Sequence, residues 1–394
     1  MIDFDEAQRL IAAEVKPLGS ERISIAEATD RVLAEPLFAR SDAPRQAVAA
    51  MDGYAVIGAS TRAGEPLQLI GESRAGAGFA GRVETGQAVR IFTGAPMPDG
   101  ADRCIMQEYA SRDGNFVQFA DGYGPGWHVR KAGSDFRQGD MLLDAGTRLG
   151  PRAMVAAAAA DVFEVAVGLR PCIAIIGTGD ELQPPGTAWQ QPDAIPDSVT
   201  FGVAAMVMGA GGVVIDRQTG VDELTALETL AGRALDMADL TIITGGASVG
   251  ERDFAKAMFA SHGLQLLFEK VAIKPGKPVW IGRAKNRWVL GLPGNPTSAM
   301  VTARLFLLPL LARLQGQSID EVLRWRTLSL AAAIAPTGGR ETFMRARWDD
   351  EGLVPINNQD SGTQAAMASA DWLIRCKAKQ GSLAVGQAVR ALAF

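Results

Sequence analysis

Short apolar runs alternate with segments of helical spacing between residues 171 and 316, and this alternation limits the folds available to the chain. Cys172–Ile176, Leu240–Thr244 and Trp288–Leu292 have the length and composition of buried strands. Strands that alternate with helices form a mostly parallel sheet covered on both faces. We therefore predict an α/β multidomain protein with a doubly wound α/β domain. Its other expected elements are strands at Val213–Asp216 and Leu264–Val271 and helices from Asp197 or Ser198 to 209–212, at 222–237, near 252–262 and at Thr297–Leu314.

The flanking sequence has a different texture. Residues 3–16 and 149–160 have helical apolar spacing, and a strand is expected at Val162–Val167. From about 41 to 136 glycine is dense and short apolar runs are separated by turn residues, which is typical of an all-β segment. Short runs after about 317 predict a second, small β domain. The length of 394 residues is enough for several domains.

Charge and cysteine usage disfavour several classes of protein. The formal net charge is −5 and no basic stripe is present, so nucleic-acid binding is not expected. The candidate thiolate and imidazole ligands are few and far apart, which argues against structural zinc or a disulfide framework. These residues are Cys104, Cys172, Cys376, His128 and His262. The N-terminal MIDFDEAQRL lacks the apolar core of a signal peptide, and Leu305–Ala312 is too short to span a bilayer. We expect a cytoplasmic protein without membrane contact.

The first loop of interest is GTGDEL at Gly177–Leu182, directly after a predicted strand. Open α/β sheets bind ligands outside the carboxyl ends of their strands. Gly177 and Gly179 allow a sharp turn and close backbone approach. Thr178 and Gly179 are the candidate cofactor-binding residues of this loop. Asp180 and Glu181 could hold a divalent cation beside a phosphate. The alternative is a plain turn with two solvated acids.

The second loop is TGGASVGERDF at Thr244–Phe254, which exposes several backbone N–H groups ahead of a helix. Such an arrangement binds anions. The residues that would contribute are Gly245, Gly246, Ser248 and Gly250. Asp253 would lie on the opening helical turn, as a partner of the helix dipole or as a metal ligand. The alternative is a structural turn, because the P-loop pattern GxxxxGK[ST] is absent.

The third loop is GLPGNPTSAM at Gly291–Met300. Two prolines stiffen it, and the glycine and asparagine between them accept unusual dihedral angles. These residues are Pro293, Gly294, Asn295 and Pro296. Thr297 or Ser298 could cap the long helix and leave its first N–H groups open to a ligand. The alternative is a rigid helix start without a ligand.

Three lysines lie close together in EKVAIKPGKP at Glu269–Pro278. Lys270 and Lys274 flank an apolar triplet, and Lys277 follows a Pro-Gly turn. A solvated charged face is the usual interpretation of such a run. Lysines at a strand end would instead neutralise an oxyanion such as phosphate or molybdate.

Two loops of the β-rich segment combine glycine and aspartate. They are MDGYA at Met51–Ala55 and TGAPMPDGAD at Thr93–Asp102. Taken alone, each is typical of a structural turn.

In their order along the chain, these motifs resemble the molybdopterin molybdenumtransferases, the family of bacterial MoeA and the gephyrin E domain. The resemblance covers nearly the whole chain, and its most specific part is the combination of MDGYAV, IKPGKP and GLPGNP. The other matching motifs are IFTGAPMPDGAD, GSD at 133–135, GTGDEL and TGGASVGERDF.

The resemblance implies a fold of four regions. A linking and dimerisation domain would comprise 1–40 and 137–170, and a β-rich domain would cover 41–136. The α/β molybdopterin-binding domain would cover 171–316, and a C-terminal β-barrel would cover 317–394. Family members are homodimers whose cleft lies between the α/β domain of one subunit and the β-rich region of the other.

The resemblance also implies a reaction. The family inserts molybdate into adenylylated molybdopterin with Mg²⁺, releases AMP and yields molybdenum cofactor. Further implied partners are a molybdopterin adenylyltransferase and apo-molybdoenzymes. The contributions expected from the partner subunit are Asp52, Thr93 and Asp135. The acids and bases expected on the α/β domain are Glu181, Asp222, Asp253, Lys270 and Lys274, with Pro293 and Pro296 shaping the pterin loop.

Two segments depart from the family pattern. The Asn-Ser pair that usually precedes AMDGYA is Val48–Ala49 here. The family's Tyr-Asp-(Ser/Thr)-Asn segment is Pro196–Asp197–Ser198–Val199. Two alternatives therefore stay open: a molybdopterin adenylyltransferase, and a catalytically weakened paralogue that binds pterin or acts as a scaffold.

Overall fold

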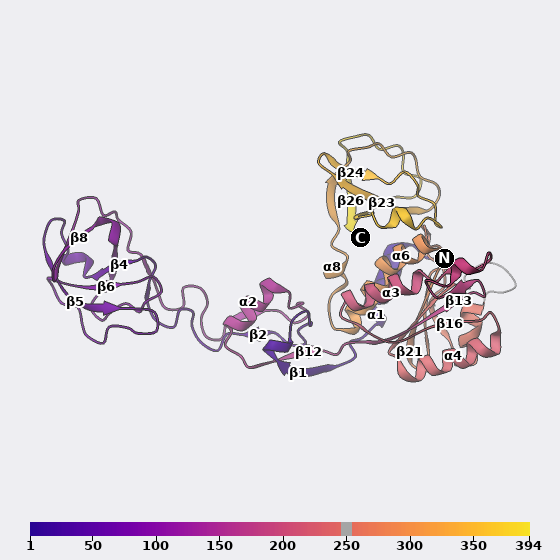
Figure 1. Cartoon of the computed structure of the whole chain (residues 1–394), viewed down its shortest axis with the longest axis horizontal. Helices are drawn as coiled ribbons and strands as arrows, with labels where there is room; N and C mark the ends of the chain where they lie inside the picture. Colours follow the sequence, from indigo (N-terminus) through magenta and orange to yellow (C-terminus); the bar gives the residue numbers. More distant parts are fainter. Residues whose placement is uncertain (246–253) are drawn as a thin grey trace. The chain divides into compact units, whose positions relative to one another are not determined.

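The computed structural model of the chain describes residues 1–245 and 254–394. Its contacts divide the chain into two units (Figure 1). Unit 1 comprises Met1–Glu35, Ala145–Gly150 and Ala166–Phe394, and unit 2 comprises Pro36–Asp144 and Pro151–Val165.

A six-stranded sheet lies at the centre of unit 1. Its strand order is β16-β13-β17-β21-β20-β18. The strands are β13 (Cys172–Thr178), β16 (Val213–Gly220), β17 (Leu240–Thr244), β18 (Gln265–Phe268), β20 (Trp280–Ala284) and β21 (Arg287–Leu292). The pairs β16/β13, β13/β17 and β17/β21 are parallel, which confirms the predicted mostly parallel sheet. Every residue of β17 is buried, as expected for a strand covered on both faces.

The edge of this sheet formed by β20 and β18 differs from the prediction. We did not predict β20, which pairs antiparallel with β21 and β18. Gly282 and Arg283 interrupt its apolar run, and the Arg283 guanidinium lies over the ring of Trp288, 4.7 Å from its centroid. The predicted strand Leu264–Val271 was wrong at its end, because β18 stops at Phe268 and the chain then leaves the sheet. The predicted Val213–Asp216 extends to Gly220.

Helices cover both faces of the sheet. On one face, residues of α1, α3 and the α6–α7 helix pack against Ile173, Ile175 and Ile242. On the other face, α4 and α5 pack against Ala174, Ile176 and Ile243. Alternate residues of each strand thus serve opposite layers. The helices of unit 1 are α1 (Phe4–Glu14), α3 (Val199–Gly209), α4 (Leu224–Met237), α5 (Phe254–Ala260), α6 (Pro296–Thr302), a π-helical segment (Ala303–Leu307), α7 (Leu308–Leu314) and α8 (Ile319–Val322).

Helices α6 and α7 form one continuous helix through the π-helical segment. By length and composition Pro296–Leu314 could cross a membrane, but 83% of its most apolar window is buried inside the protein, so it is a core helix. The prediction that Thr297 or Ser298 caps this helix was wrong. Pro296 occupies the first helical turn and moves the N-cap position back to Asn295.

A second sheet of unit 1 follows in sequence. Its order is β19-β23-β25-β26-β22, with β24 paired to β23. The strands are β19 (Ile273–Lys274), β22 (Arg326–Ser329), β23 (Glu341–Asp349), β24 (Gly352–Pro355), β25 (Trp372–Cys376) and β26 (Ala388–Ala393). The small β domain predicted after residue 317 is therefore present, and β19 joins it from an earlier part of the chain.

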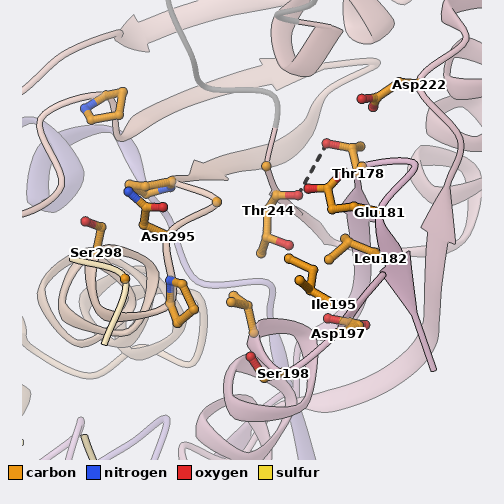
Figure 2. Close-up of a pocket in the computed structure, with 18 of the residues that line it drawn as sticks. Thr178, Glu181, Leu182, Ile195, Asp197, Ser198, Asp222, Thr244, Asn295 and Ser298 are labelled. Atoms are coloured by element: carbon orange, nitrogen blue, oxygen red, sulfur yellow. Dashed lines mark hydrogen bonds between the residues drawn. The ribbon is translucent and has the colours of Figure 1, made fainter. Parts of the chain in front are cut away.

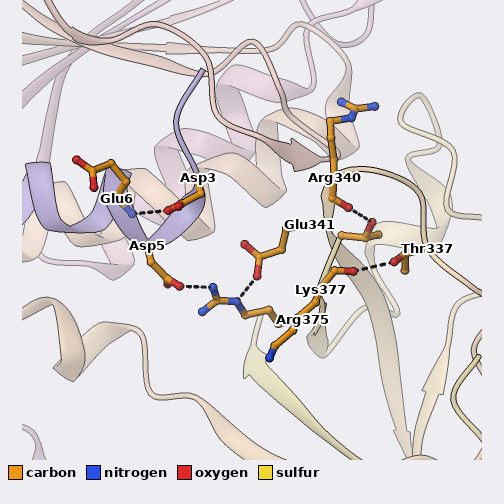
Figure 3. A network of polar contacts seen from close by, with 9 residues as sticks. Asp3, Asp5, Glu6, Thr337, Arg340, Glu341, Arg375 and Lys377 are labelled. Atoms are coloured by element: carbon orange, nitrogen blue, oxygen red, sulfur yellow. Dashed lines mark hydrogen bonds and ion pairs between the residues drawn. The ribbon is translucent and has the colours of Figure 1, made fainter. Parts of the chain in front are cut away.

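Helix α1 is tied to this second sheet by charge and aromatic packing. Figure 3 shows Asp5 and Glu341 directed at the Arg375 guanidinium, at 2.8 and 2.6 Å. The same guanidinium lies over the ring of Phe4 at 4.9 Å. Phe4 in turn contacts Phe343 edge-on, with ring centroids 5.0 Å apart. The N-terminal helix and the C-terminal sheet therefore share one core.

Unit 2 contains the predicted β-rich segment. Its six-stranded sheet has the order β7-β4-β6-β5-β9-β8. The strands are β4 (Gly53–Val56), β5 (Leu67–Ser73), β6 (Gln87–Ile91), β7 (Arg103–Met106), β8 (Ala110–Asp113) and β9 (Phe116–Phe119). Short pairs join β3 (Val48–Ala49) to β10 (Val129–Arg130) and β2 (Leu37–Phe38) to β11 (Met141–Leu143). The pair of β1 (Ser20–Ser24) with β12 (Glu164–Gly168) belongs mostly to unit 1. Helix α2 spans Pro151–Ala159.

Candidate functional site

The three loops predicted to bind a ligand follow neighbouring strands of the central sheet. In the register of β13, β17 and β21, Gly177 is opposite Thr244, and Thr244 is opposite Leu292. The carboxyl ends of these strands are therefore level with one another. A Cβ atom on Gly245 would lie 2.5 Å from the Thr178 carbonyl oxygen, and one on Gly294 would lie 3.2 Å from the Gly245 Cα. The described parts of the three loops thus converge, as predicted.

A cavity of about 910 Å³ opens at these strand ends. Figure 2 shows Thr244 at its centre, with Asn295 and Ser298 to one side and Thr178, Glu181 and Leu182 to the other. The predicted site residues that line it are Thr178, Gly179, Glu181, Asp222, Gly245, Lys270, Lys277, Pro293, Gly294, Asn295, Pro296 and Ser298. The predicted residues Gly246, Ser248, Gly250 and Asp253 lie outside the described residues.

Two acidic residues, Glu181 and Asp222, line the cavity from the loops after β13 and β16. Of the two acids predicted to hold a metal, Glu181 lines the cavity, whereas Asp180 accepts a hydrogen bond from the Asp222 backbone N–H at 2.9 Å. Asp180 therefore ties the loop after β16 to the loop after β13, and Asp222 lines the cavity beside Glu181 (Figure 2). Within residues 1–245 and 254–394, no cluster of three or more His, Cys, Asp or Glu is placed to hold a metal ion.

Lysines also contribute to the cavity wall. Lys270 and Lys277 line the cavity from the segment between β18 and β20, and Lys256 joins them from α5. Lys256 was missed by the sequence analysis because a single lysine on a short helix carries no pattern. Lys274 does not line the cavity. It is exposed on β19, opposite Thr342 of β23.

A loop from the second sheet forms a further part of the wall, and the sequence analysis missed it. Gly362 and Gln364 line the cavity. The first turn of α6 holds this loop, because the Thr297 backbone N–H donates to the Ser361 carbonyl at 3.1 Å and the Thr297 hydroxyl donates to the Thr363 carbonyl at 2.7 Å. The only signal in the sequence is the polar run 357–364.

Arg345 organises this loop from inside the protein. Its side chain is 1% exposed and donates to the carbonyls of Asn358 at 2.7 Å and Asp360 at 3.1 Å. Burial lowers the pKa of Arg345 below its ordinary value. The bonds to carbonyl oxygens compensate the buried guanidinium and fix the loop against β23.

Comparison with known proteins agrees with this architecture. Family models described as MoeA N-terminal region (domain I and II), probable molybdopterin binding domain and MoeA C-terminal region (domain IV) match residues 2–160, 174–313 and 327–394. The molybdopterin molybdenumtransferase of Haemophilus influenzae is 33% identical over 402 residues, covering 99% of this chain and 98% of that protein. The chain belongs to the molybdopterin molybdenumtransferase family.

Other members of the family are similar over the same length. The molybdopterin molybdenumtransferase of Synechococcus elongatus is 32% identical and covers 99% of this chain and 98% of its own. A crystal structure of the molybdopterin biosynthesis MoeA protein from Pyrococcus horikoshii has a TM-score of 0.85 at 25% identity and full coverage of both chains. The multidomain MoeA fold, with an α/β domain and a C-terminal β-rich domain, is therefore the fold of this chain.

One departure from the family pattern falls on the cavity wall. Pro196, Asp197, Ser198 and Val199 all line the cavity, and Val199 is the first residue of α3. The Asp197 carboxylate, 6% exposed, accepts from the Thr200 backbone N–H at 3.2 Å and from its hydroxyl. Asp197 is thus the capping side chain of α3, and Ser198 makes no capping bond. The retained aspartate of this segment has a structural role.

The family's other expected site residues lie in unit 2. Asp52 and Thr93 form a tight pair, in which the Thr93 backbone N–H and hydroxyl each donate to Asp52 Oδ1 at 2.7 Å. These bonds hold the pKa of Asp52 below its ordinary value of 3.8. Asp135 is exposed, and its backbone N–H donates to the Ala43 carbonyl at 3.0 Å. The second departure, Val48–Ala49, forms β3 and packs with Ala49 buried.

Proposed function

We propose that this chain inserts molybdate into adenylylated molybdopterin, releases AMP and yields molybdenum cofactor. The observation that carries the proposal is the charge arrangement of the cavity at the strand ends. Lysines line the cavity from the chain between β17 and β20, with Glu269 among them, whereas Glu181 and Asp222 line it from the loops after β13 and β16, at the other edge of the sheet. Glycine backbone follows the strands between them. Both substrates are anions that need this combination of ammonium groups and backbone N–H groups. Membership of the family supports the same reaction.

The lysine side suits the oxyanions. Lys270 and Lys277 come from one segment, and their ammonium groups lower the electrostatic cost of placing molybdate beside a phosphorylated pterin. Thr178 and Ser298 would supply hydrogen-bond donors to the pterin and its phosphate. No protein nucleophile is required, since the attacking atom belongs to molybdate or water.

The carboxylate side suits Mg²⁺, on which we propose the reaction depends. Mg²⁺ is usually held by one or two carboxylates together with substrate phosphates. Glu181 and Asp222 provide two carboxylates in the cavity. When bound, Mg²⁺ would neutralise charge on the phosphoanhydride. Asp180 would act by holding the Asp222 loop.

We further propose a cytoplasmic homodimer in which the partner subunit supplies Asp52, Thr93 and Asp135 to the cavity. The tight pairing of Asp52 with Thr93 supports this role, because it keeps one carboxylate ionised and fixed in direction. Asp253, Lys274 and the glycines of the second loop remain proposed contributors on family resemblance. So do the four domain boundaries and the partners, an adenylyltransferase and apo-molybdoenzymes.

The test is a direct assay. The purified chain is incubated with adenylylated molybdopterin, molybdate and Mg²⁺, and AMP release is measured together with reconstitution of an apo-molybdoenzyme. We expect molybdate-dependent AMP release that is lost on chelation of Mg²⁺. No AMP release under conditions where the Haemophilus influenzae relative is active would contradict the enzymatic function and favour the weakened paralogue. Adenylylated pterin formed from ATP without molybdate would identify an adenylyltransferase instead.

A further inference from the structure

A carboxylate lies between two lysines on the basic side of the cavity. Glu269 Oε1 is 3.6 Å from Lys270 Nζ, and Glu269 Oε2 is 4.0 Å from Lys256 Nζ. All three residues line the cavity. Their side chains are 32% (Lys256), 41% (Lys270) and 50% (Glu269) exposed.

These ion pairs are too loose to stabilise the fold appreciably. Solvent-accessible pairs contribute roughly 0–1 kcal/mol, and least when the charged atoms are several ångströms apart. Glu269 is half exposed, so its carboxylate can turn towards water without leaving a buried charge. The arrangement therefore leaves Glu269 as a replaceable counterion of two ammonium groups.

A tetrahedral dianion is the ligand that would replace this carboxylate best. It carries twice the charge of Glu269 and offers oxygens to both ammonium groups at once. Displacing Glu269 costs the same for any ligand, but the attraction to the two lysines doubles from a monoanion to a dianion. A monoanion exchanges one charge for an equal one and gains little.

We propose that Lys256 and Lys270 bind a tetrahedral dianion and that Glu269 is the internal anion which this ligand displaces. Lys256 is then a binding residue for the oxyanion. Glu269 competes with every anion for the two lysines, and a monoanion cannot compensate for its displacement. This inference rests on the proposed function for the identity of the dianion. It is either molybdate or the phosphate group of the nucleotide.

Calorimetric titration of the intact protein with molybdate and perrhenate tests this proposal without turnover. The two ions have the same tetrahedral shape, but perrhenate carries a single charge. We expect Glu269→Gln to strengthen the binding of both ions, by roughly tenfold, because the competing anion is gone. We expect Lys256→Met to weaken molybdate binding by about tenfold and perrhenate binding by only about threefold, since half the charge loses half the free energy.

The matched control is Lys285→Met. Lys285 has a similar exposure and pairs with Asp236 at 2.9 Å, and it does not line the cavity. Its loss should leave both affinities unchanged, and thermal unfolding checks that all three variants are folded. If Glu269 only ties α5 to the neighbouring segment, Glu269→Gln will leave molybdate binding unchanged or weaken it, and the proposal is wrong. Unchanged affinity for both molybdate and AMP in Lys256→Met would overturn it equally.

Titration with AMP identifies the source of the dianion. An AMP affinity that falls in Lys256→Met assigns the site to the nucleotide phosphate, and an unchanged AMP affinity with weakened molybdate binding assigns it to molybdate. The outcome for the proposed function is separate. A protein with the expected anion affinities but no AMP release keeps this inference and loses the enzymatic function. AMP release with unaltered anion affinities in both variants would support the enzymatic function and contradict this inference.

Discussion

Two carboxylates of this chain, one in each unit, are held in opposite ways. In the cavity of unit 1, Glu269 lies 3.6 and 4.0 Å from the ammonium groups of two partly exposed lysines. In unit 2, Asp52 Oδ1 accepts two hydrogen bonds of 2.7 Å from Thr93 alone. The first group can exchange partners when a ligand enters, whereas the second is fixed in direction beforehand. The difference indicates that the ion pairs of Glu269 can change when a ligand binds, whereas the Asp52 carboxylate keeps one orientation.

The two regions nevertheless share one device, which is close backbone approach at a glycine. A Cβ atom on Gly245 would meet the Thr178 carbonyl oxygen at 2.5 Å, and one on Gly53, beside Asp52, would meet the Ile105 carbonyl oxygen at 2.0 Å. The charged side chains of the cavity are therefore positioned by backbone segments that contact one another closely.

The largest effect is expected from Gly245→Ala. Gly245 has φ +98°, which alanine adopts only with strain, and its new methyl group would clash with Thr178. We expect a loss of about 2 kcal/mol in the free energy of unfolding and at least a roughly hundredfold slower AMP release, because the strand ends would separate. Gly338→Ala is the control, since nothing lies within 4 Å of its new methyl group. Near-normal turnover of Gly245→Ala would mean that the strand ends need not approach.

The next effect separates two lysines that the sequence treats alike. Lys270 lines the cavity, whereas Lys274 is exposed on β19 and does not. We expect Lys270→Ala to lower kcat/KM for AMP release by about a hundredfold and Lys274→Ala, a proposed contributor from outside the cavity, by less than about tenfold, because only Lys270 lines the cavity proposed to hold the oxyanion. Steady-state kinetics of both variants provides the measurement. A larger loss of kcat/KM in Lys274→Ala than in Lys270→Ala would place Lys274 in the active site and contradict the assignment of the active site to the cavity.

A smaller effect on turnover is expected from the wall of the cavity. Arg345→Met would leave the carbonyls of Asn358 and Asp360 without their buried donor. We expect a loss of about 2–3 kcal/mol in unfolding free energy and a KM for the pterin substrate raised about five- to tenfold with little change in kcat. Arg347→Met on the same strand is the control, since Arg347 is half exposed and pairs with Asp349 at the surface. Equal effects of the two variants in urea unfolding would show that the loop does not depend on Arg345.

The sequence predicted the residues that follow strands, and it did so for a physical reason. Parallel neighbouring strands end at one edge, so Thr178, Gly245 and Gly294 had to meet once the alternation of strands and helices was recognised. The same reasoning failed for β20, where Gly282 and Arg283 hide the strand pattern. It also misplaced the cap of α6, because Pro296 takes the first helical position.

Residues brought to the cavity by tertiary packing carried no such signal. Lys256 reaches it from the first turn of a short helix, and Gly362 and Gln364 reach it from a loop about 70 residues beyond the third strand tip. Their positions depend on the docking of the second sheet against α6 through Thr297. No local pattern records that docking, so the sequence alone could not have placed them.

The smallest effect sharpens the comparison at Asp52. Its pKa is lowered first by the Thr93 backbone N–H and second by the Thr93 hydroxyl. Thr93→Val removes only the hydroxyl, so the pKa of Asp52 should rise towards 3.8 yet stay below it. A lowered carboxyl pKa stabilises the folded protein at pH values above the ordinary pKa of 3.8, and this contribution is lost as pH falls through the lowered pKa. The Asp52 carboxyl therefore stays ionised at neutral pH in both proteins. AMP release at neutral pH should therefore fall only a few-fold, through lost orientation. An NMR titration of the Asp52 carboxyl carbon measures the shift, and Thr93→Ser, which retains the hydroxyl, should keep the lower value. An equal titration midpoint in the valine and serine variants would mean that the Thr93 backbone N–H alone lowers the pKa of Asp52. The hydroxyl would then contribute as little to orienting Asp52 as the loose ion pairs contribute to Glu269.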